Sequence, residues 1–74
     1  MARKPSIENR IRELRFHAGE MTQAELGRRV GVTRQTIIAM EQNRYSPSLE
    51  AAFKIAHVFG KPLEEVFQYV PPDG

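Results

Sequence analysis

The sequence predicts an all-α domain of five short helices, and three observations support this class. Apolar residues recur at spacings of three and four along most of the chain, which is the period of a helix with one buried face. Residues that begin helices (Ser6, Thr22, Thr33, Ser48, Pro62) alternate with residues that end them (Gly19, Gly31, Asn43, Gly60). With 74 residues and no cysteine, the chain has no disulfide to support a small core, so a bundle with mostly local contacts is the economical solution.

The first helix is predicted over residues 7–17. Ser6 can cap its first turn, and Gly19 can end it. Its inner stripe consists of Ile7, Ile11 and Leu14. Residues 1–6 precede it as a basic arm, and two alternatives are open for Arg3 and Lys4: contact with DNA, as in other proteins with such arms, or no contact at all.

The second and third helices are predicted within residues 22–42, TQAELGRRVGVTRQTIIAMEQ. Each has an apolar pair on one face, Leu26 with Val30 and Ile37 with Met40. Gly31 suits the turn between them, because glycine adopts positive φ without a Cβ clash. Thr22 and Glu25 match a capping box, in which the hydroxyl binds the amide at position 25 and the carboxylate reaches back. The outer face of the third helix is polar, as a helix in a DNA major groove requires.

Two further helices are predicted after Pro47. Ser48 caps one that ends at Gly60, with an apolar band of Leu49, Ala52, Phe53, Ile55, Ala56 and Phe59. Pro62 stands in the first turn of the last helix, where its missing amide is not needed. That helix is expected to turn Leu63, Val66 and Phe67 inward.

This pattern resembles the helix-turn-helix of the Cro and phage-repressor (Cro/CI-type, XRE) family of transcriptional regulators. The residues that carry the resemblance are Gln23, Gly27, Gly31, Ile37 and Met40. The similarity extends from about Ile11 through YSPSLEAAFKIAHVFGKPLEEVF. It implies a five-helix, lambda-repressor-like DNA-binding domain over residues 7–70, between an arm at 1–6 and a tail at 71–74. Gly27 stands where the family usually has alanine, and a glycine costs roughly 0.5–1 kcal/mol in a helix.

Base contacts are expected along the outer face of the third helix. Arg34 can donate two hydrogen bonds to guanine, and Gln35 can pair with adenine. Ala39 is small enough to let the helix approach a thymine methyl, and Gln42 can reach a base or a phosphate. For Ile38, contact with thymine methyls and packing against a neighbouring helix are equally open.

Phosphate contacts are expected at the ends of these two helices. The free amides behind Thr22 and Thr33 suit an anion. The resemblance places Gln23, Asn43 and Arg44 at phosphates as well, although a local turn without DNA contact is an equal alternative for Asn43. Such contacts set the register on DNA without reading its sequence.

The resemblance also implies an ion pair between Arg15, at the end of the first helix, and Glu41, near the end of the third. A planar guanidinium can hold a carboxylate by two parallel hydrogen bonds and tolerate partial burial. We expect this pair to be structural. The alternative is two independent solvated charges.

The charge distribution favours nucleic acid as the partner. Residues 1–45 carry nine Lys and Arg against five Asp and Glu, whereas residues 46–74 carry two against four. No glycine-rich phosphate loop, nucleophile elbow or paired metal motif occurs, and Glu13 and Glu20 near His17 form only a weak metal set. We therefore predict no enzyme activity, no catalytic residue, no metal site and no cofactor.

The predicted function is that of a cytoplasmic, nucleoid-associated regulator, a repressor by preference, that binds a near-palindromic site on double-stranded DNA as a homodimer. The C-terminal helix region is the expected dimer contact, because Tyr69 and Val70 adjoin a short acidic helix, although a chain end that folds back explains them equally well. No membrane segment is expected. The alternative function is an antitoxin that binds a toxin and regulates its own operon.

Overall fold

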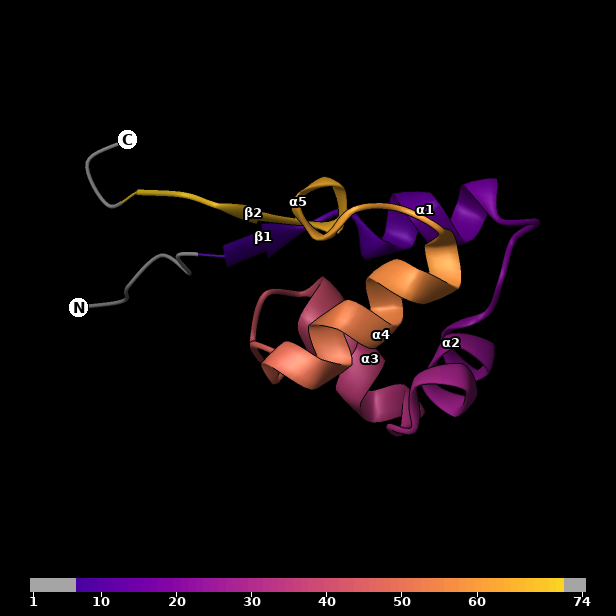
Figure 1. The fold of residues 1–74 in the computed structure, drawn as a ribbon. Coiled ribbons are helices and arrows are strands. Elements are labelled where there is room, and N and C mark those ends of the chain that lie inside the picture. Colours follow the sequence, from indigo (N-terminus) through magenta and orange to yellow (C-terminus); the bar gives the residue numbers. More distant parts are fainter. Residues whose placement is uncertain (1–6, 72–74) are drawn as a thin grey trace.

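The computed structural model describes residues 7–71 (Figure 1). In chain order these residues form β1 (Ile7–Asn9), α1 (Ile11–His17), α2 (Gln23–Val30), α3 (Arg34–Glu41), α4 (Leu49–Phe59), α5 (Leu63–Val66) and β2 (Phe67–Tyr69). The prediction of five helices is confirmed, and a small two-stranded sheet is added to it. The predicted cap at Ser6 and the basic arm lie outside the described residues. None of the described helices has the length and hydrophobicity that crossing a bilayer requires.

The sheet corrects the predicted start of the first helix, and it places Phe67, expected in the last helix, in β2. β1 pairs antiparallel with β2, with Ile7 opposite Tyr69 and Asn9 opposite Phe67. α1 begins only at Ile11, whose amide donates to the side-chain oxygen of Asn9 at 3.1 Å. The backbone of residues 7–9 therefore forms its hydrogen bonds with β2, which lies about 60 positions further along the chain. The helical spacing of apolar residues does not indicate this partner.

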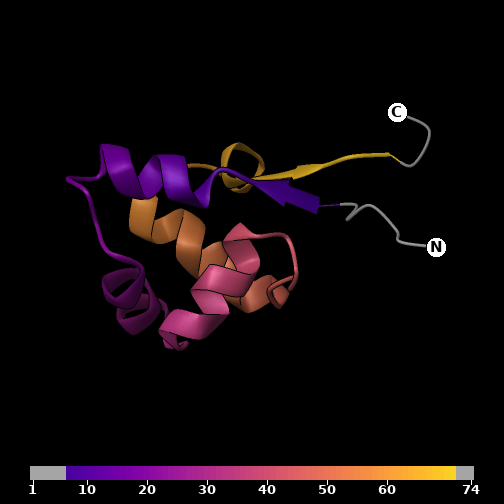
Figure 2. The ribbon, with the colours of Figure 1, turned by 180° about the vertical axis from the view of Figure 1, so that it is seen from behind.

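The core lies where α2, α3 and α4 meet beneath α1 and α5. Its buried side chains are Ile11, Leu26, Val30, Ile37, Met40, Ile55, Ala56 and Val66. In both views α4 runs between α1 on one side and the α2–α3 pair on the other (Figures 1 and 2). The two apolar pairs predicted for α2 and α3 are thus confirmed as core residues.

α4 buries a narrower face than predicted. Ala52, Ile55 and Ala56 are buried, and Phe59 packs against the core. These positions follow the i, i+3, i+4, i+7 pattern of a single stripe. The prediction that Leu49 and Phe53 belong to the same band is wrong, because both side chains lie beside this stripe and are exposed.

Gly27 lies at the closest approach between α2 and the turn. A Cβ built on Gly27 would lie 2.7 Å from the backbone oxygen of Val32. The Gly27 carbonyl also accepts hydrogen bonds from the amides of Gly31 and Val32, at 2.8 and 2.9 Å, which hold the turn in place. Close packing against the turn therefore requires a residue without a side chain at position 27. This requirement outweighs the cost of a glycine in helix propensity.

We expect Gly27→Ala to lower the free energy of unfolding by about 1 kcal/mol, because the backbone of the turn must shift to admit the methyl group. Helix propensity alone would raise the free energy by about 1 kcal/mol. Urea unfolding followed by circular dichroism distinguishes the expected loss of stability from the gain that helix propensity alone would give. Ala24→Gly, at an exposed position of the same helix, serves as the control for propensity without a clash.

Candidate nucleic-acid interface

α2 and α3 form a helix-turn-helix whose ends are set by short-range hydrogen bonds. Gly31 ends α2 in the left-handed conformation, with φ of +88°. The Thr22 hydroxyl accepts from the Glu25 amide at 3.0 Å, and the Thr33 hydroxyl accepts from the Thr36 amide at 3.1 Å. Both threonines thus cap their helices, as predicted.

The second half of the predicted capping box is not formed. The Glu25 carboxylate pairs along its own helix, with Arg29 Nε at 2.7 Å and with Arg28. Two cations at i+3 and i+4 outcompete the single Thr22 amide for this exposed carboxylate. Arg28 and Arg29 are consequently engaged within α2.

The outer face of α3 is open to solvent where the best base-contact candidates lie. Arg34 and Gln35 occupy its first turn, and both are exposed. Ile37 and Met40 lie on the opposite face and are fully buried. The core therefore fixes the rotation of α3 about its axis and keeps the first two side chains outward.

The remaining base-contact candidates lie along the same outer face. Ile38 and Ala39 are half-buried, and Gln42 is exposed at the C-terminal cap of α3. Arg44 Nη1 donates to the side-chain oxygen of Gln42 at 3.0 Å. This bond brings the predicted phosphate-contacting arginine and the predicted base-contacting glutamine together.

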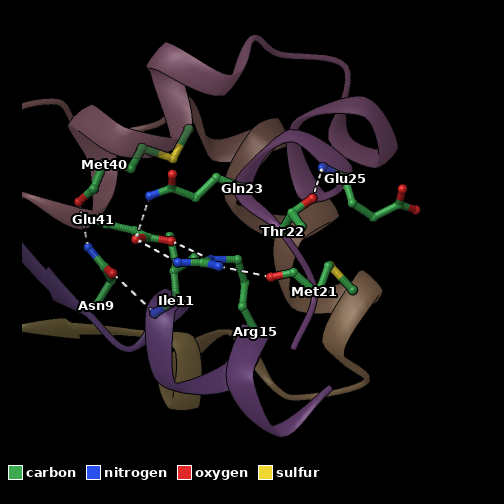
Figure 3. Close-up of polar contacts among 9 residues, drawn as sticks. All are labelled: Asn9, Ile11, Arg15, Met21, Thr22, Gln23, Glu25, Met40 and Glu41. Atoms are coloured by element: carbon green, nitrogen blue, oxygen red, sulfur yellow. Dashed lines mark hydrogen bonds and ion pairs between the residues drawn. The ribbon is translucent and has the colours of Figure 1, made fainter. Parts of the chain in front are cut away.

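Glu41 is the centre of a polar network that joins α1, α2 and α3 (Figure 3). Arg15 donates to its carboxylate twice, from Nε to Oε2 at 2.7 Å and from Nη2 to Oε1 at 3.1 Å. Arg15 Nη1 also donates to the carbonyl of Met21 at 2.8 Å. The side chains of Arg15 and Glu41 are only 15% and 9% exposed, so this is a bidentate pair shielded from water.

Gln23 belongs to the same network, which its sequence position did not indicate. Its Nε2 donates to Glu41 Oε1 at 3.1 Å, from the first residue of α2. The side chain predicted to lie at a phosphate thus also ties the start of α2 to the end of α3 (Figure 3).

Asn9 provides a second link that sequence reasoning missed. Its Nδ2 donates to the Met40 carbonyl at 2.7 Å and to Asn43 Oδ1 at 3.1 Å. Asn43 itself has φ of +59° and ends α3 in the left-handed conformation. Only the β1–β2 pairing brings Asn9 to this place, so no local signal in the sequence identifies it.

An open hollow lies between the end of α1, the start of α2 and the outer face of α3. It is lined by Arg12, Arg15, Thr22, Gln23, Ala24, Arg34, Ile38, Glu41 and Gln42. Arg12 was not predicted as a site residue. It is exposed, and it takes part in none of the ion pairs found among residues 7–71. Because Glu41 is already paired with Arg15, Arg12 and Arg34 give this hollow a positive character.

An exposed pair at the start of α1 shows the expected mutual effect on ionisation. A hydrogen bond and the charge of Arg10 lower the pKa of Glu13, and Glu13 in turn raises the pKa of Arg10. A carboxyl with a lowered pKa stabilises the fold above its ordinary pKa and loses this effect as the pH falls through the lowered value. Solvent screens this pair, so its contribution is small.

The described residues contain no group of three or more histidine, aspartate or glutamate side chains placed to hold a metal ion. The arrangement is instead a surface: an exposed polar helix face, two capped helix starts and two accessible arginines. Such a surface suits the edge and backbone of a nucleic-acid duplex.

Comparison with known proteins agrees with this geometry. A family model described as Helix-turn-helix matches residues 11–66. An uncharacterized HTH-type transcriptional regulator of Methanothermobacter thermautotrophicus is 57% identical over 58 residues, 77% of this chain and 83% of the relative. One of Archaeoglobus fulgidus is 49% identical over 61 residues, 82% of this chain and 86% of the relative. The cryptic phage CTXphi transcriptional repressor RstR of Vibrio cholerae is 34% identical over 60 residues, 81% of this chain and 53% of the relative.

Proposed function

Because the chain belongs to the helix-turn-helix family of the Cro and phage-repressor (XRE) type, we propose that it represses transcription by binding a near-palindromic operator as a homodimer. It is a DNA-binding transcriptional regulator and not an enzyme. The observation that carries the proposal is the outer face of α3, where Arg34 and Gln35 are exposed above a buried pair. Such a regulator works on double-stranded DNA in the cytoplasm, at the nucleoid.

The first turn of α3 enters the major groove in this proposal. Arg34 donates to guanine O6 and N7, and Gln35 pairs with adenine N6 and N7. The side chains that follow along the same face are Ile38, Ala39 and Gln42. Ala39 allows close approach to the groove floor, and Ile38 offers a methyl-rich contact for thymine.

The ends of α2 and α3 bind the DNA backbone. The phosphate-contacting residues in this proposal are Thr22, Gln23, Thr33, Asn43 and Arg44. An amide nitrogen carries two hydrogens, so Gln23 can donate one to Glu41 and the other to a phosphate. Arg12 joins this set, because it lines the same hollow as Gln23 and Arg34.

Two arguments support repression at a symmetric site. A single domain of this size contacts only a few base pairs, and two copies on half-sites about 34 Å apart multiply both affinity and specificity. One relative is named as a phage transcriptional repressor. Occupation of an operator by a small dimer blocks polymerase without any further domain.

Selection of bound oligonucleotides from a random pool tests the proposal. We expect an inverted repeat with half-sites one helical turn apart, bound with an affinity that falls steeply as salt rises. Selection of a single unrepeated motif would contradict the homodimer. Failure to enrich any sequence would contradict sequence-specific repression.

We expect Arg12→Ala and Gln23→Ala to weaken binding to all DNA sequences alike. Because only a cationic side chain releases a counterion, Arg12→Ala should also reduce the slope of log affinity against log salt by about one, whereas Gln23→Ala should leave the slope unchanged. Fluorescence anisotropy on the selected site and on random DNA measures both effects. Lys61→Ala, which removes an exposed cation beyond α4, is the matched control and should leave the salt slope unchanged.

A further inference from the structure

The side chain of Asn9 makes three hydrogen bonds, and two of them fix its orientation. Its Oδ1 accepts from the backbone amide of Ile11 at 3.1 Å, and its Nδ2 donates to the backbone carbonyl of Met40 at 2.7 Å (Figure 3). A backbone amide only donates and a backbone carbonyl only accepts, so the opposite orientation would lose both bonds. The second hydrogen of Nδ2 is thus the one that faces Asn43.

The orientation of the Asn9 amide determines that of the Asn43 amide. Because Asn9 Nδ2 is a donor, the atom of Asn43 that lies 3.1 Å from it is the acceptor Oδ1. The nitrogen of Asn43 is therefore on the other branch of the carboxamide, turned away from Asn9. Asn43 is exposed, so this NH2 group is accessible to a ligand. The two orientations of a carboxamide have nearly the same shape, but they present opposite polarity.

We propose that Asn9 is a positioning residue for DNA binding, because it holds the Asn43 carboxamide with its NH2 group directed at a phosphate. This inference rests on the proposed function, in which Asn43 contacts the DNA backbone, and it assigns that contact to Asn43 Nδ2. Phosphate oxygens are negatively charged acceptors, so an outward NH2 group attracts them and an outward carbonyl oxygen repels them. Asn9 thereby selects the class of ligand without touching it.

The backbone on both sides of this bond is held in place. Asn43 has φ of +59°, and its amide donates to the Met40 carbonyl at 3.0 Å, the same carbonyl that accepts from Asn9. Asn9 belongs to β1, which pairs with β2, and the amide of Arg10 donates to the Val66 carbonyl at 2.9 Å. A side chain that is ordered in advance loses less conformational freedom on binding. The sheet therefore contributes to DNA binding although it lies outside the helix-turn-helix.

The side chains next to Asn43 have the same polarity. Arg44 Nη1 donates to Gln42 Oε1 at 3.0 Å, and arginine only donates, so the oxygen of Gln42 is occupied as well. Three consecutive exposed residues at the end of α3 thus present N–H groups and one positive charge. Such a set of donors suits a phosphate group.

A double-mutant cycle tests whether Asn9 acts through Asn43. Asn43→Gly removes the carboxamide and keeps the turn, because glycine readily adopts positive φ. Asn9→Ser keeps an acceptor for the Ile11 amide, since a serine hydroxyl can bond the backbone two residues on, but it removes the NH2 group that faces Asn43. Fluorescence anisotropy on the selected operator measures both variants and their combination, at a temperature at which circular dichroism shows that each is folded.

We expect Asn43→Gly to weaken operator binding about tenfold, the loss of one hydrogen bond to a charged group. Asn9→Ser should weaken binding about threefold, because the released carboxamide turns either atom outward and keeps about half of that free energy. In the Asn43→Gly background, Asn9→Ser should have no further effect, since no carboxamide remains to be positioned. A purely structural role of Asn9 would give the same loss in both backgrounds, and that result would overturn the inference.

Gln68→Ser is the matched control. Gln68 lies in β2, and its Nε2 donates to the backbone carbonyl of Glu64 at 3.2 Å. This variant therefore also removes a bond from a carboxamide to a backbone carbonyl, but one that does not involve α3. It should leave operator affinity unchanged. A loss as large as that of Asn9→Ser would attribute both effects to the sheet as a whole and overturn the positioning role.

Operators with one phosphate at a time replaced by a neutral methylphosphonate locate the contact on the DNA. The phosphate bound by Asn43 is the one whose replacement weakens the wild type but not Asn43→Gly. Asn9→Ser should be less sensitive than the wild type to replacement of this phosphate and equally sensitive at all others. An equal change at every phosphate would contradict a role directed through Asn43.

The remaining outcomes separate this inference from the proposed function. In the free protein, NMR couplings through the hydrogen bond should join the side-chain nitrogen of Asn9 to the carboxamide carbon of Asn43, and the reverse coupling would overturn the inference. Unchanged operator affinity in Asn43→Gly would also overturn it and leave sequence-specific repression in place. A chain that enriches no sequence, yet shows the expected cycle on random DNA, has the reverse result. A chain that binds no DNA overturns both.

Discussion

Arg15→Ala is expected to lower the free energy of unfolding by about 3 kcal/mol, the lower end of the loss for a buried ion pair, because this pair is only partly buried. The Glu41 carboxylate would keep only the hydrogen bond from Gln23 while remaining largely out of water. The Met21 carbonyl would also lose its donor from Arg15. Urea unfolding at neutral pH measures the change.

Two variants control this experiment. Arg10→Ala removes an arginine of an exposed pair at the start of the same helix, and its effect on stability should be small. Combining Arg15→Met with Glu41→Leu removes both charges and should recover much of the loss, because apolar side chains of similar size can replace a buried pair. If Arg15→Ala were as mild as Arg10→Ala, the pair would not be the clamp between α1 and α3.

Arg34→Ala is expected to weaken binding to the selected operator by roughly 1–3 kcal/mol and to relax the preference at one base pair. The bidentate contact with guanine would be lost, while phosphate contacts would remain. Gln35→Ala should have a similar effect at an adenine. Fluorescence anisotropy with the operator and its single-base variants measures both the affinity and the altered preference.

Random DNA distinguishes base reading from phosphate binding for Arg34, since its side chain lines the same hollow as Gln23. Arg34→Ala should weaken binding to random DNA clearly less than binding to the operator. Arg44→Ala should weaken the operator and random DNA to the same extent. An equal loss on both kinds of DNA for Arg34→Ala would assign this arginine to the backbone.

The helix-turn-helix could be predicted because its signals are local. Thr22 and Thr33 cap helices by bonds that span three residues, and Gly31 supplies a positive φ at a single position. The buried pairs on α2 and α3 follow from helical spacing alone. The outward orientation of Arg34 and Gln35 follows from these features, without knowledge of the rest of the fold.

The features that could not be predicted depend on partners distant in sequence. The β1–β2 pairing joins the two ends of the described chain, and it brings Asn9 to the end of α3. Gln23 meets Glu41 because the start of α2 lies beside the end of α3 in the folded chain. The close approach at Gly27 and the place of Arg12 beside the α2 start likewise arise from packing between elements.

α4 shows most clearly which features the sequence determines and which depend on the tertiary structure. Its sequence is apolar around much of the helix, so periodicity identifies a helix with caps at Ser48 and Gly60 but allows several choices of inner face. Packing against α2 and the core selects Ala52, Ile55 and Ala56, and leaves Leu49 and Phe53 outside. Neighbouring residues determine helix caps and turns, because these depend on short-range hydrogen bonds and backbone conformation. The choice of the apolar side chains that are buried depends on how all the helices pack together.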